Sequence, residues 1–252
     1  MSNLKIGLIG LVNEEAQADF WGTMKKVAEI GYQGVESPSH LLEGNVSENL
    51  RRFHDLGLQV VAVPASRESL RDNLDQVIAD AKALQTTNVA MYWAPANSKE
   101  QLLQDAELYN YTGGRLAEAG LRLCYHNHEH EFKASYNGLY ALDILAEYTD
   151  PKCVFFEIDI AWVTFGGEDP VKVLRRYAGR VPAIHVKDLW SLHQRDLFTA
   201  VGTGVVKIRE AMEAAAETGV EWAVIEQDHL RNLNAFETIT ISYLNLKEQG
   251  LA

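Results

Sequence analysis

Three histidines and two glutamates lie close together in CYHNHEHEF, residues 124–132, directly after an apolar run. Imidazole and carboxylate groups at this density could bind a metal ion or move protons near neutral pH. If the preceding strand continues, its period of two puts His126 and His128 on one face. The next residues then form a loop, from which Glu131 can turn back. The alternative is a polar loop whose histidines are solvated.

Three further polar residues, Asp159, His185 and Glu226, each lie near the end of an apolar segment: FFEIDIAW, PAIHVKDL and WAVIEQD. If these segments are neighbouring parallel strands, about 4.8 Å apart, their inward side chains converge. Two carboxylates and one imidazole form an oxygen and nitrogen set that suits Mn²⁺, Mg²⁺, Co²⁺ or Zn²⁺. Singly, each residue has a structural alternative: a helix cap, a core histidine or an ion pair. Three such residues at the ends of consecutive predicted strands favour a metal site.

The elements that must position these residues alternate along the chain. Short Val, Ile and Leu-rich runs predict strands, and amphipathic segments between them predict helices, several of which end on a glycine. The eight strand candidates are residues 4–10, 34–39, 59–66, 88–93, 121–127, 154–162, 182–189 and 222–228. Eight strand–helix units that follow one another without a linker predict one domain over residues 1–252. The predicted fold is α/β, a single parallel (β/α)8 TIM barrel. A doubly wound open sheet is the alternative, but no G-x-G-x-x-G follows the first strand.

In such a barrel the site lies at the C-terminal ends of the strands, where other polar residues also occur. Glu36 could bind substrate or support the barrel mouth. Trp162 could line a pocket against the apolar face of a sugar ring. Lys187, with its neighbour Asp188, could orient substrate. The glycine turn VGTGVV, residues 201–206, could hold an anion on its amides, but no basic residue accompanies it, which argues against phosphate.

Composition excludes several classes of function. The chain has 252 residues and a formal net charge of −12, which disfavours nucleic acid as a partner. No apolar run approaches the roughly 18 residues of a membrane span, and the N-terminus lacks the pattern of a secretory signal. The 2 cysteines predict no disulfide framework and fit a reducing cytoplasm. The sequence does not indicate an oligomeric state.

The chain resembles the xylose isomerase-like superfamily of TIM barrels, in particular the sugar phosphate isomerase/epimerase group, which includes ketohexose 3-epimerases and inosose dehydratases. The resemblance spans the whole chain and rests on YHNHEHEF, FEIDIAWVTFGGEDPV, IHVKDL, VGTGVV and VIEQD. It implies one divalent metal ion, for which we expect Mn²⁺ first and Mg²⁺, Co²⁺ or Zn²⁺ next. It also implies that Asp159, His185 and Glu226 are metal ligands.

At the first ligand position the sequence departs from these epimerases, which carry a glutamate at the end of the fifth strand. The residue aligned with it is His126. Either His126 is the ligand, or Glu131 reaches in from the loop and His126 moves protons. A third carboxylate suits a divalent ion that binds sugar hydroxyls, which favours Glu131. Of the paired glutamates that such epimerases use as two bases, only Glu226 has a match.

The resemblance implies a metal-dependent isomerase or epimerase that removes a proton next to a carbonyl, and the lack of a phosphate-binding motif indicates an unphosphorylated sugar or keto-sugar as the substrate. The metal would stabilise the enediolate. Glu226 or Glu131 would take the proton, and His126 or His128 would return one. Its return to carbon gives epimerisation or isomerisation, whereas its transfer to a departing hydroxyl gives dehydration. The alternative is therefore a lyase or hydratase for keto-sugars or inososes.

Two further alternatives use the same barrel without this chemistry. An abasic-site endonuclease needs more His and Asp ligands and a basic DNA-binding face, which a net charge of −12 disfavours. A sugar-binding barrel without catalysis would bind no metal ion. We therefore expect a small sugar or cyclitol as the substrate.

Overall fold

Nine parallel strands form one sheet in the computed structural model, which describes residues 4–252. The strands follow the order β3-β2-β1-β13-β10-β9-β6-β5-β4. The two outer strands, β3 (Gln59–Val60) and β4 (Val63–Ala65), are separated by only two residues of the chain. They are therefore two halves of one barrel strand, which pairs with β2 on one side and with β5 on the other and closes the sheet.

The structure confirms the predicted (β/α)8 TIM barrel, because each of the eight strand candidates contains barrel strand. The remaining barrel strands are β1 (Lys5–Leu8), β2 (Gly34–Val35), β5 (Asn88–Met91), β6 (Arg122–His126), β9 (Val154–Asp159), β10 (Ala183–Val186) and β13 (Trp222–Ile225). Most of their residues are buried, as expected for parallel strands that side chains cover on one face and helices on the other.

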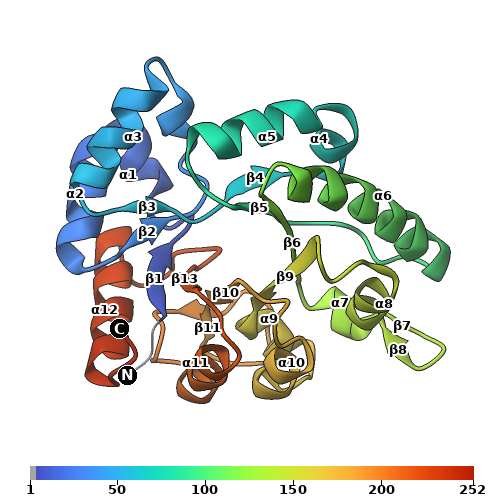
Figure 1. Ribbon diagram of the computed structural model, residues 1–252. Coiled ribbons are helices and arrows are strands. Elements are labelled where there is room, and N and C mark those ends of the chain that lie inside the picture. The colour runs from blue at the N-terminus through green and yellow to red at the C-terminus, as the bar shows by residue number, and fades with distance from the viewer. Residues whose placement is uncertain (1–3) are drawn as a thin grey trace.

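Helices surround the barrel strands, as Figure 1 shows. They are α1 (Asn13–Ala18), α2 (Phe20–Ile30), α3 (Val46–Asp55), α4 (Arg67–Asp72), α5 (Leu74–Ala83), α6 (Lys99–Glu118), α8 (Ala141–Tyr148), α10 (Pro170–Arg176), α11 (Ile208–Glu217) and α12 (Ala235–Glu248), with a short 3-10 helix η1 (Ser39–Leu42). The chain between α1 and α2 breaks at Asp19, whose side chain accepts from the Gly22 amide and starts α2. No helix within residues 4–252 is long and apolar enough to cross a membrane.

The predicted strands are longer than the observed barrel strands, and in one of them the difference matters for the site. The prediction extends from residue 154 to 162, whereas β9 ends at Asp159 and α9 (Ile160–Phe165) begins immediately after it. The Asp159 side chain accepts hydrogen bonds from the amides of Ala161 and Trp162 and so caps α9. The apolar residues of this segment therefore form a buried helix instead of further strand.

Short elements in the loops lie after the C-terminal ends of β6 and β10. After β6 comes α7 (His130–Lys133), followed by a hairpin of β7 (Ser135–Tyr136) and β8 (Leu139–Tyr140). Asn137 and Gly138 both have positive φ at its turn, so an Asn-Gly signal for this hairpin was present in the sequence. After β10, the strands β11 (Asp188–Leu189) and β12 (Phe198–Thr199) pair in antiparallel fashion.

Candidate metal centre

Four side chains meet at the C-terminal ends of the barrel strands: His126, Asp159, His185 and Glu226. One nitrogen or oxygen atom of each lies within 4.8 Å of the others. They come from the ends of β6 and β9, from β10, and from the residue after β13. Asp159 and His185 are partners in the parallel register of β9 and β10, which puts their side chains at the same height. The structure thus brings together the three predicted strand-end residues, with His126 beside them.

The helix cap fixes how Asp159 faces this cluster. Its Oδ1 accepts the amides of Ala161 at 3.0 Å and Trp162 at 2.9 Å. Its Oδ2 makes no hydrogen bond within residues 4–252, although Lys187 Nζ lies 3.1 Å away. Burial raises the pKa of Asp159 to about 6, and the nearby Lys187 ammonium opposes this rise. One carboxylate oxygen is therefore held by the backbone, and the other is left for the cluster.

The Glu131 carboxylate is fully buried and has other partners. The Tyr125 hydroxyl donates to its Oε1 at 2.6 Å, and the His128 amide donates to its Oε2 at 2.9 Å. Burial raises the pKa of Glu131 to about 7. Within the part of the chain that the structure describes, two groups of donor atoms converge: one from His126, Asp159, His185 and Glu226, and one from Glu36, Glu157 and His185. Neither group contains Glu131.

Two buried glutamates, Glu36 and Glu157, lie on the other side of the two imidazoles. Glu36 Oε1 accepts from the Tyr92 hydroxyl at 2.6 Å and lies 3.2 Å from His185 Nε2. Glu157 Oε2 lies 3.3 Å from His126 Nδ1 and 3.3 Å from His185 Nε2. Burial and the neighbouring Glu36 raise the pKa of Glu157 well above its usual range.

Lys187 is a buried cation beside the cluster. Its Nζ lies 2.6 Å from Asp228 Oδ1, 2.9 Å from Glu226 Oε2 and 3.1 Å from Asp159 Oδ2. Burial alone would lower the pKa of Lys187, but these three carboxylates raise it above its usual value, so the group stays charged. Its ammonium also lies 5.2 Å from the centre of the Trp162 ring.

The charges and donors fit a divalent cation. Five carboxyl groups face two cationic side chains, Lys187 and His185. The five are those of Glu36, Glu157, Asp159, Glu226 and Asp228. Burial lowers the pKa of His126 well below its usual value, so its imidazole is neutral and has a lone pair to offer. Among residues 4–252, Asp159 Oδ2 and Glu157 Oε2 are buried acceptors without a hydrogen bond. Unpaired buried acceptors of this kind are costly unless a cation satisfies them.

A cavity of about 450 Å³ is lined by three of the four converging residues, His126, His185 and Glu226. This volume is within the range of small-molecule sites, roughly 300–1,000 Å³. Of the residues predicted to bind substrate, Glu36, His128 and Lys187 line it. Trp162 does not line it, because its ring is fully buried below Lys187 and lies 4.3 Å from the Arg195 guanidinium.

Several residues of this cavity, and Glu157 beside it, are not among those predicted from the sequence. Its lining also includes Asn13, Ser37 and Tyr92. Tyr92 follows β5 directly, so the rule that barrel sites lie at strand ends could have identified it. Glu157 stands two residues before Asp159 in β9, and the strand period of two places both on one face.

The glycine turn at residues 201–206 binds a carboxylate of the chain itself. The Asp188 carboxylate accepts the amides of Gly202 at 3.0 Å, Gly204 at 2.8 Å and Val206 at 3.1 Å. A Cβ at Gly204 would collide with the backbone oxygen of Leu189 and with the Asp188 side chain. The amides expected to be free for an anion are therefore occupied by Asp188.

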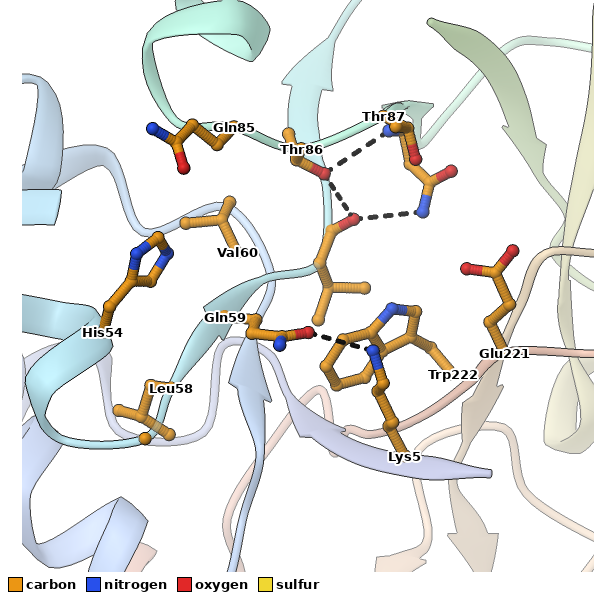
Figure 2. Close-up of a pocket in the computed structure, with 13 residues that line it drawn as sticks. Lys5, His54, Leu58, Gln59, Val60, Gln85, Thr86, Thr87, Glu221 and Trp222 are labelled. Carbon is orange, nitrogen blue, oxygen red and sulfur yellow. Dashed lines mark hydrogen bonds between the residues drawn. The ribbon is translucent and has the colours of Figure 1, made fainter. Parts of the chain in front are cut away.

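A second cavity, of about 440 Å³, lies at the opposite end of the barrel. Figure 2 shows the residues that line it, among them Lys5 and Trp222, which begin β1 and β13. Its polar groups are largely paired with each other: Lys5 Nζ donates to Gln59 Oε1 at 3.0 Å, and Thr86 Oγ1 donates to the Val61 carbonyl at 2.8 Å. Residues at this end of a TIM barrel usually serve stability, so the candidate site is the first cavity.

Comparisons with known proteins agree with this architecture. A family model described as xylose isomerase-like TIM barrel matches residues 24–240. Inosose dehydratase 2 of Bacillus cereus is 24% identical over 192 residues, which cover 70% of this chain and 59% of that protein. The chain thus matches less than two thirds of the length of this curated relative.

Solved structures share the fold at low sequence identity. A sugar phosphate isomerase/epimerase from Parabacteroides distasonis ATCC 8503 has a TM-score of 0.80 and 21% identity, and the match covers 100% of this chain and 96% of that one. An IolI protein with a bound zinc atom has a TM-score of 0.76 and 12% identity, with 97% of each chain covered. At these identities the likeness shows the fold. Because the family model matches most of the chain, the protein belongs to the xylose isomerase-like TIM barrel family.

Proposed function

We propose that the protein is a divalent-metal-dependent isomerase or epimerase that removes a proton next to the carbonyl of an unphosphorylated keto-sugar or cyclitol. The observation that carries this proposal is the convergence of His126, Asp159, His185 and Glu226 within 4.8 Å beside a cavity of ligand size. The presence of isomerases or epimerases and inosose dehydratases among its relatives supports the same reaction class.

In this proposal His126 takes the first ligand position, and Glu131 does not. Glu131 is held by Tyr125 and by the His128 amide, whereas His126 Nε2 lies 3.9 Å from Asp159 Oδ2. Two imidazoles and two carboxylates suit Mn²⁺, Co²⁺ or Zn²⁺ better than Mg²⁺, which prefers oxygen ligands. We keep Mn²⁺ as the first choice. A bound zinc atom in IolI, a structural neighbour, supports a divalent ion.

When bound, the ion would act as a Lewis acid that polarises the substrate carbonyl and stabilises the enediolate. Glu226 is the proposed proton acceptor. Burial opposes its ionisation, but Lys187 and His185 lower the pKa of Glu226 below its usual range and keep it a carboxylate. These cations also make Glu226 a weak base, so the step requires a strongly acidified α-hydrogen. Lys187, which stays charged, stabilises negative charge that develops on substrate oxygen.

His128 is the proposed partner in proton transfer. It lines the cavity from the β6 side, while Glu226 lines it from the β13 side. Burial lowers the pKa of His128 to about 4, so the imidazole is neutral and able to accept a proton. Its Nδ1 is buried and has no hydrogen-bond partner in the described chain. Two groups on different walls could serve the two faces of a substrate.

Two features support an unphosphorylated substrate. The amides of the glycine turn are used by Asp188. The lysine that lines the cavity is paired with three carboxylates, two of which, Glu226 and Asp228, also line it. A phosphate group would therefore meet a negatively charged wall.

A carbon–oxygen lyase is the second candidate, and Lys187 is the observation that favours it. In this reaction Glu226 would take the α-proton, and the electron pair left on the α-carbon would form the new double bond as the neighbouring C–O bond breaks. The charged Lys187 ammonium would donate a proton to the departing hydroxyl, which leaves as water. Inosose dehydratases among the relatives support this outcome.

One experiment distinguishes the candidates. The purified protein is incubated with Mn²⁺ and a panel of keto-sugars and inososes in D₂O, and products are followed by NMR. Deuterium at carbon without loss of water supports an epimerase or isomerase, and an enone or dione product supports a lyase. Asp159→Asn, which removes a proposed ligand, is the control and should abolish exchange. Exchange that persists at the wild-type rate with a chelator present would overturn the metal-dependent mechanism.

A further inference from the structure

We infer that Glu157 is the positioning residue that sets which nitrogen atoms of His126 and His185 face the metal centre. This inference rests on the proposed metal site of His126, Asp159, His185 and Glu226, and it places Glu157 outside that site, beside a second group of converging donors from Glu36, Glu157 and His185. Glu157 belongs to β9 and lies opposite His126 of β6 and Ala183 of β10 in the sheet register. Its side chain is therefore between the two strands that carry the histidines.

The two imidazoles face the proposed metal site through different nitrogen atoms. His126 has Nε2 on the side of Asp159 Oδ2, at 3.9 Å, and Nδ1 on the side of Glu157 Oε2, at 3.3 Å. His185 has Nδ1 on the side of Glu226 Oε2, at 2.7 Å, and Nε2 on the side of Glu157 Oε2, at 3.3 Å. One carboxylate oxygen thus faces both nitrogens that point away from the cluster.

This arrangement decides where each ring carries its proton. A neutral imidazole has one N–H group and one lone pair, and a metal ion needs the lone pair. An acceptor at the distant nitrogen keeps the N–H there, fixes the ring orientation and makes the ligand more basic. Glu157 Oε2, 3.3 Å from both rings, would hold the N–H on Nδ1 of His126 and, together with the hydrogen-bonded Glu36 Oε1, the N–H on Nε2 of His185. This leaves His126 Nε2 and His185 Nδ1 for the ion.

Other groups near the rings cannot do this for both histidines. Glu36 Oε1 lies 3.2 Å from His185 Nε2 and already accepts from Tyr92. Within the described residues, His126 Nδ1 and Glu157 Oε2 are both buried and make no hydrogen bond at the strict geometry. These two atoms lie 3.3 Å apart, slightly beyond a normal hydrogen bond of about 2.7–3.2 Å, and His185 Nε2 lies at the same distance from Glu157 Oε2. Small side-chain movements on ion binding would shorten this contact.

The test compares Glu157→Gln with Glu131→Gln, which changes another fully buried glutamate that does not contact either ring. Affinity is measured with Zn²⁺ and Mn²⁺ by competition with a chelator. We expect Glu157→Gln to bind each ion roughly 10- to 100-fold more weakly, as is usual for loss of an outer partner of a metal-bound histidine. We expect Glu131→Gln to stay within about twofold of wild type, because its carboxylate is not part of the cluster.

An NMR measurement distinguishes a positioning role of Glu157 from a general loss of structure in the variant. Two-bond ¹H–¹⁵N correlations of the histidine rings identify the protonated nitrogen. In the Zn²⁺-loaded wild-type protein we expect His126 with its proton on Nδ1 and His185 with its proton on Nε2. The opposite assignment for either ring would overturn the inference, and this readout does not require any variant to fold. Wild-type affinity together with unchanged ring signals in Glu157→Gln would also overturn it.

The proposed metal centre and the proposed role of Glu157 can fail independently. If the wild-type protein binds neither ion, the proposed metal centre is wrong. The metal-free spectrum still tests Glu157 in that case, because His126 Nδ1 lies 3.3 Å from Glu157 Oε2 in the structure. A proton on His126 Nδ1 that moves to Nε2 in Glu157→Gln would support the positioning role without any metal.

Discussion

His185 and Glu226 are joined by a contact of 2.7 Å between Nδ1 and Oε2. Burial opposes a charge on His185, but Glu157, Glu36 and Glu226 raise its pKa well above the usual value. In the metal-free protein this contact therefore carries a proton. The same two atoms belong to the proposed ligand set, so an ion must displace that proton when it binds.

Metal binding should consequently release a proton and strengthen as the pH rises. Below the pKa of His185, the apparent affinity for Mn²⁺ should increase by up to about tenfold per pH unit. Titration calorimetry in buffers of different ionisation enthalpy measures the number of protons released. Binding without proton release, together with an affinity that does not change with pH, would contradict this prediction.

The choice between His126 and Glu131 as a ligand can be decided by metal content. His126→Ala should lose the bound ion, because it removes one of four converging donors. Glu131→Ala should keep it, although the protein should be less stable, since two hydrogen bonds to a buried carboxylate are lost. Elemental analysis after purification in Mn²⁺ and gel filtration gives the ratio of ion to protein. The reverse pattern would make Glu131 the ligand.

Glu131 also predicts how stability depends on pH. Burial raises its pKa to about 7, above a value near 4.5 in the unfolded chain, so the folded state holds its proton more tightly. The stabilisation is complete below the unfolded pKa and is lost as the pH rises through about 7. Relative to Glu131→Gln, the wild-type protein should lose about 3 kcal/mol of unfolding free energy between pH 4.5 and 8.

Urea denaturation of both proteins at several pH values, with a chelator present, measures this difference. Other titrating groups are common to both proteins and largely cancel. A constant difference between wild type and Glu131→Gln over the whole range would show that Glu131 titrates at its ordinary pH.

The fold could be predicted from the sequence because strand and helix patterns alternate along the whole chain. The strand-end rule then identified Asp159, His185 and Glu226 from the same patterns. Glu157 escaped because it stands inside an apolar segment, FFEIDIAW, where a buried charge is not expected. Only the register with His126 shows that it faces two imidazoles.

Two other features differ from what the sequence predicts. The predicted strand through Trp162 ended early because Asp159 caps α9, so its carboxylate serves both the backbone and the cluster. The glycine turn was expected to leave its amides free, but pairing of β11 with β12 brings it to Asp188, which precedes the turn by more than a dozen residues. The cap is a local contact with amides two and three residues on, whereas the position of the turn depends on tertiary geometry.

Lys187 offers a sharp test of the charge balance in the site. Lys187→Met removes the cation that faces Asp159, Glu226 and Asp228 and leaves buried carboxylates without a partner. Breaking a buried ion pair on one side costs about 3–5 kcal/mol, so the metal-free variant should unfold at clearly lower urea concentration. Lys207→Met is the matched control, because Lys207 pairs with Asp169 at 2.8 Å on the exposed surface and should contribute little.

A divalent ion should offset part of this loss. Once Lys187 is gone, Mn²⁺ becomes the main cation for the same carboxylates, so it should raise the unfolding temperature of Lys187→Met more than that of wild type. Differential scanning fluorimetry with and without Mn²⁺ measures the two shifts. Turnover should still fall in the ion-loaded variant, because the ammonium that faces the substrate is absent. Equal shifts in both proteins would mean that Lys187 and the ion do not share these carboxylates.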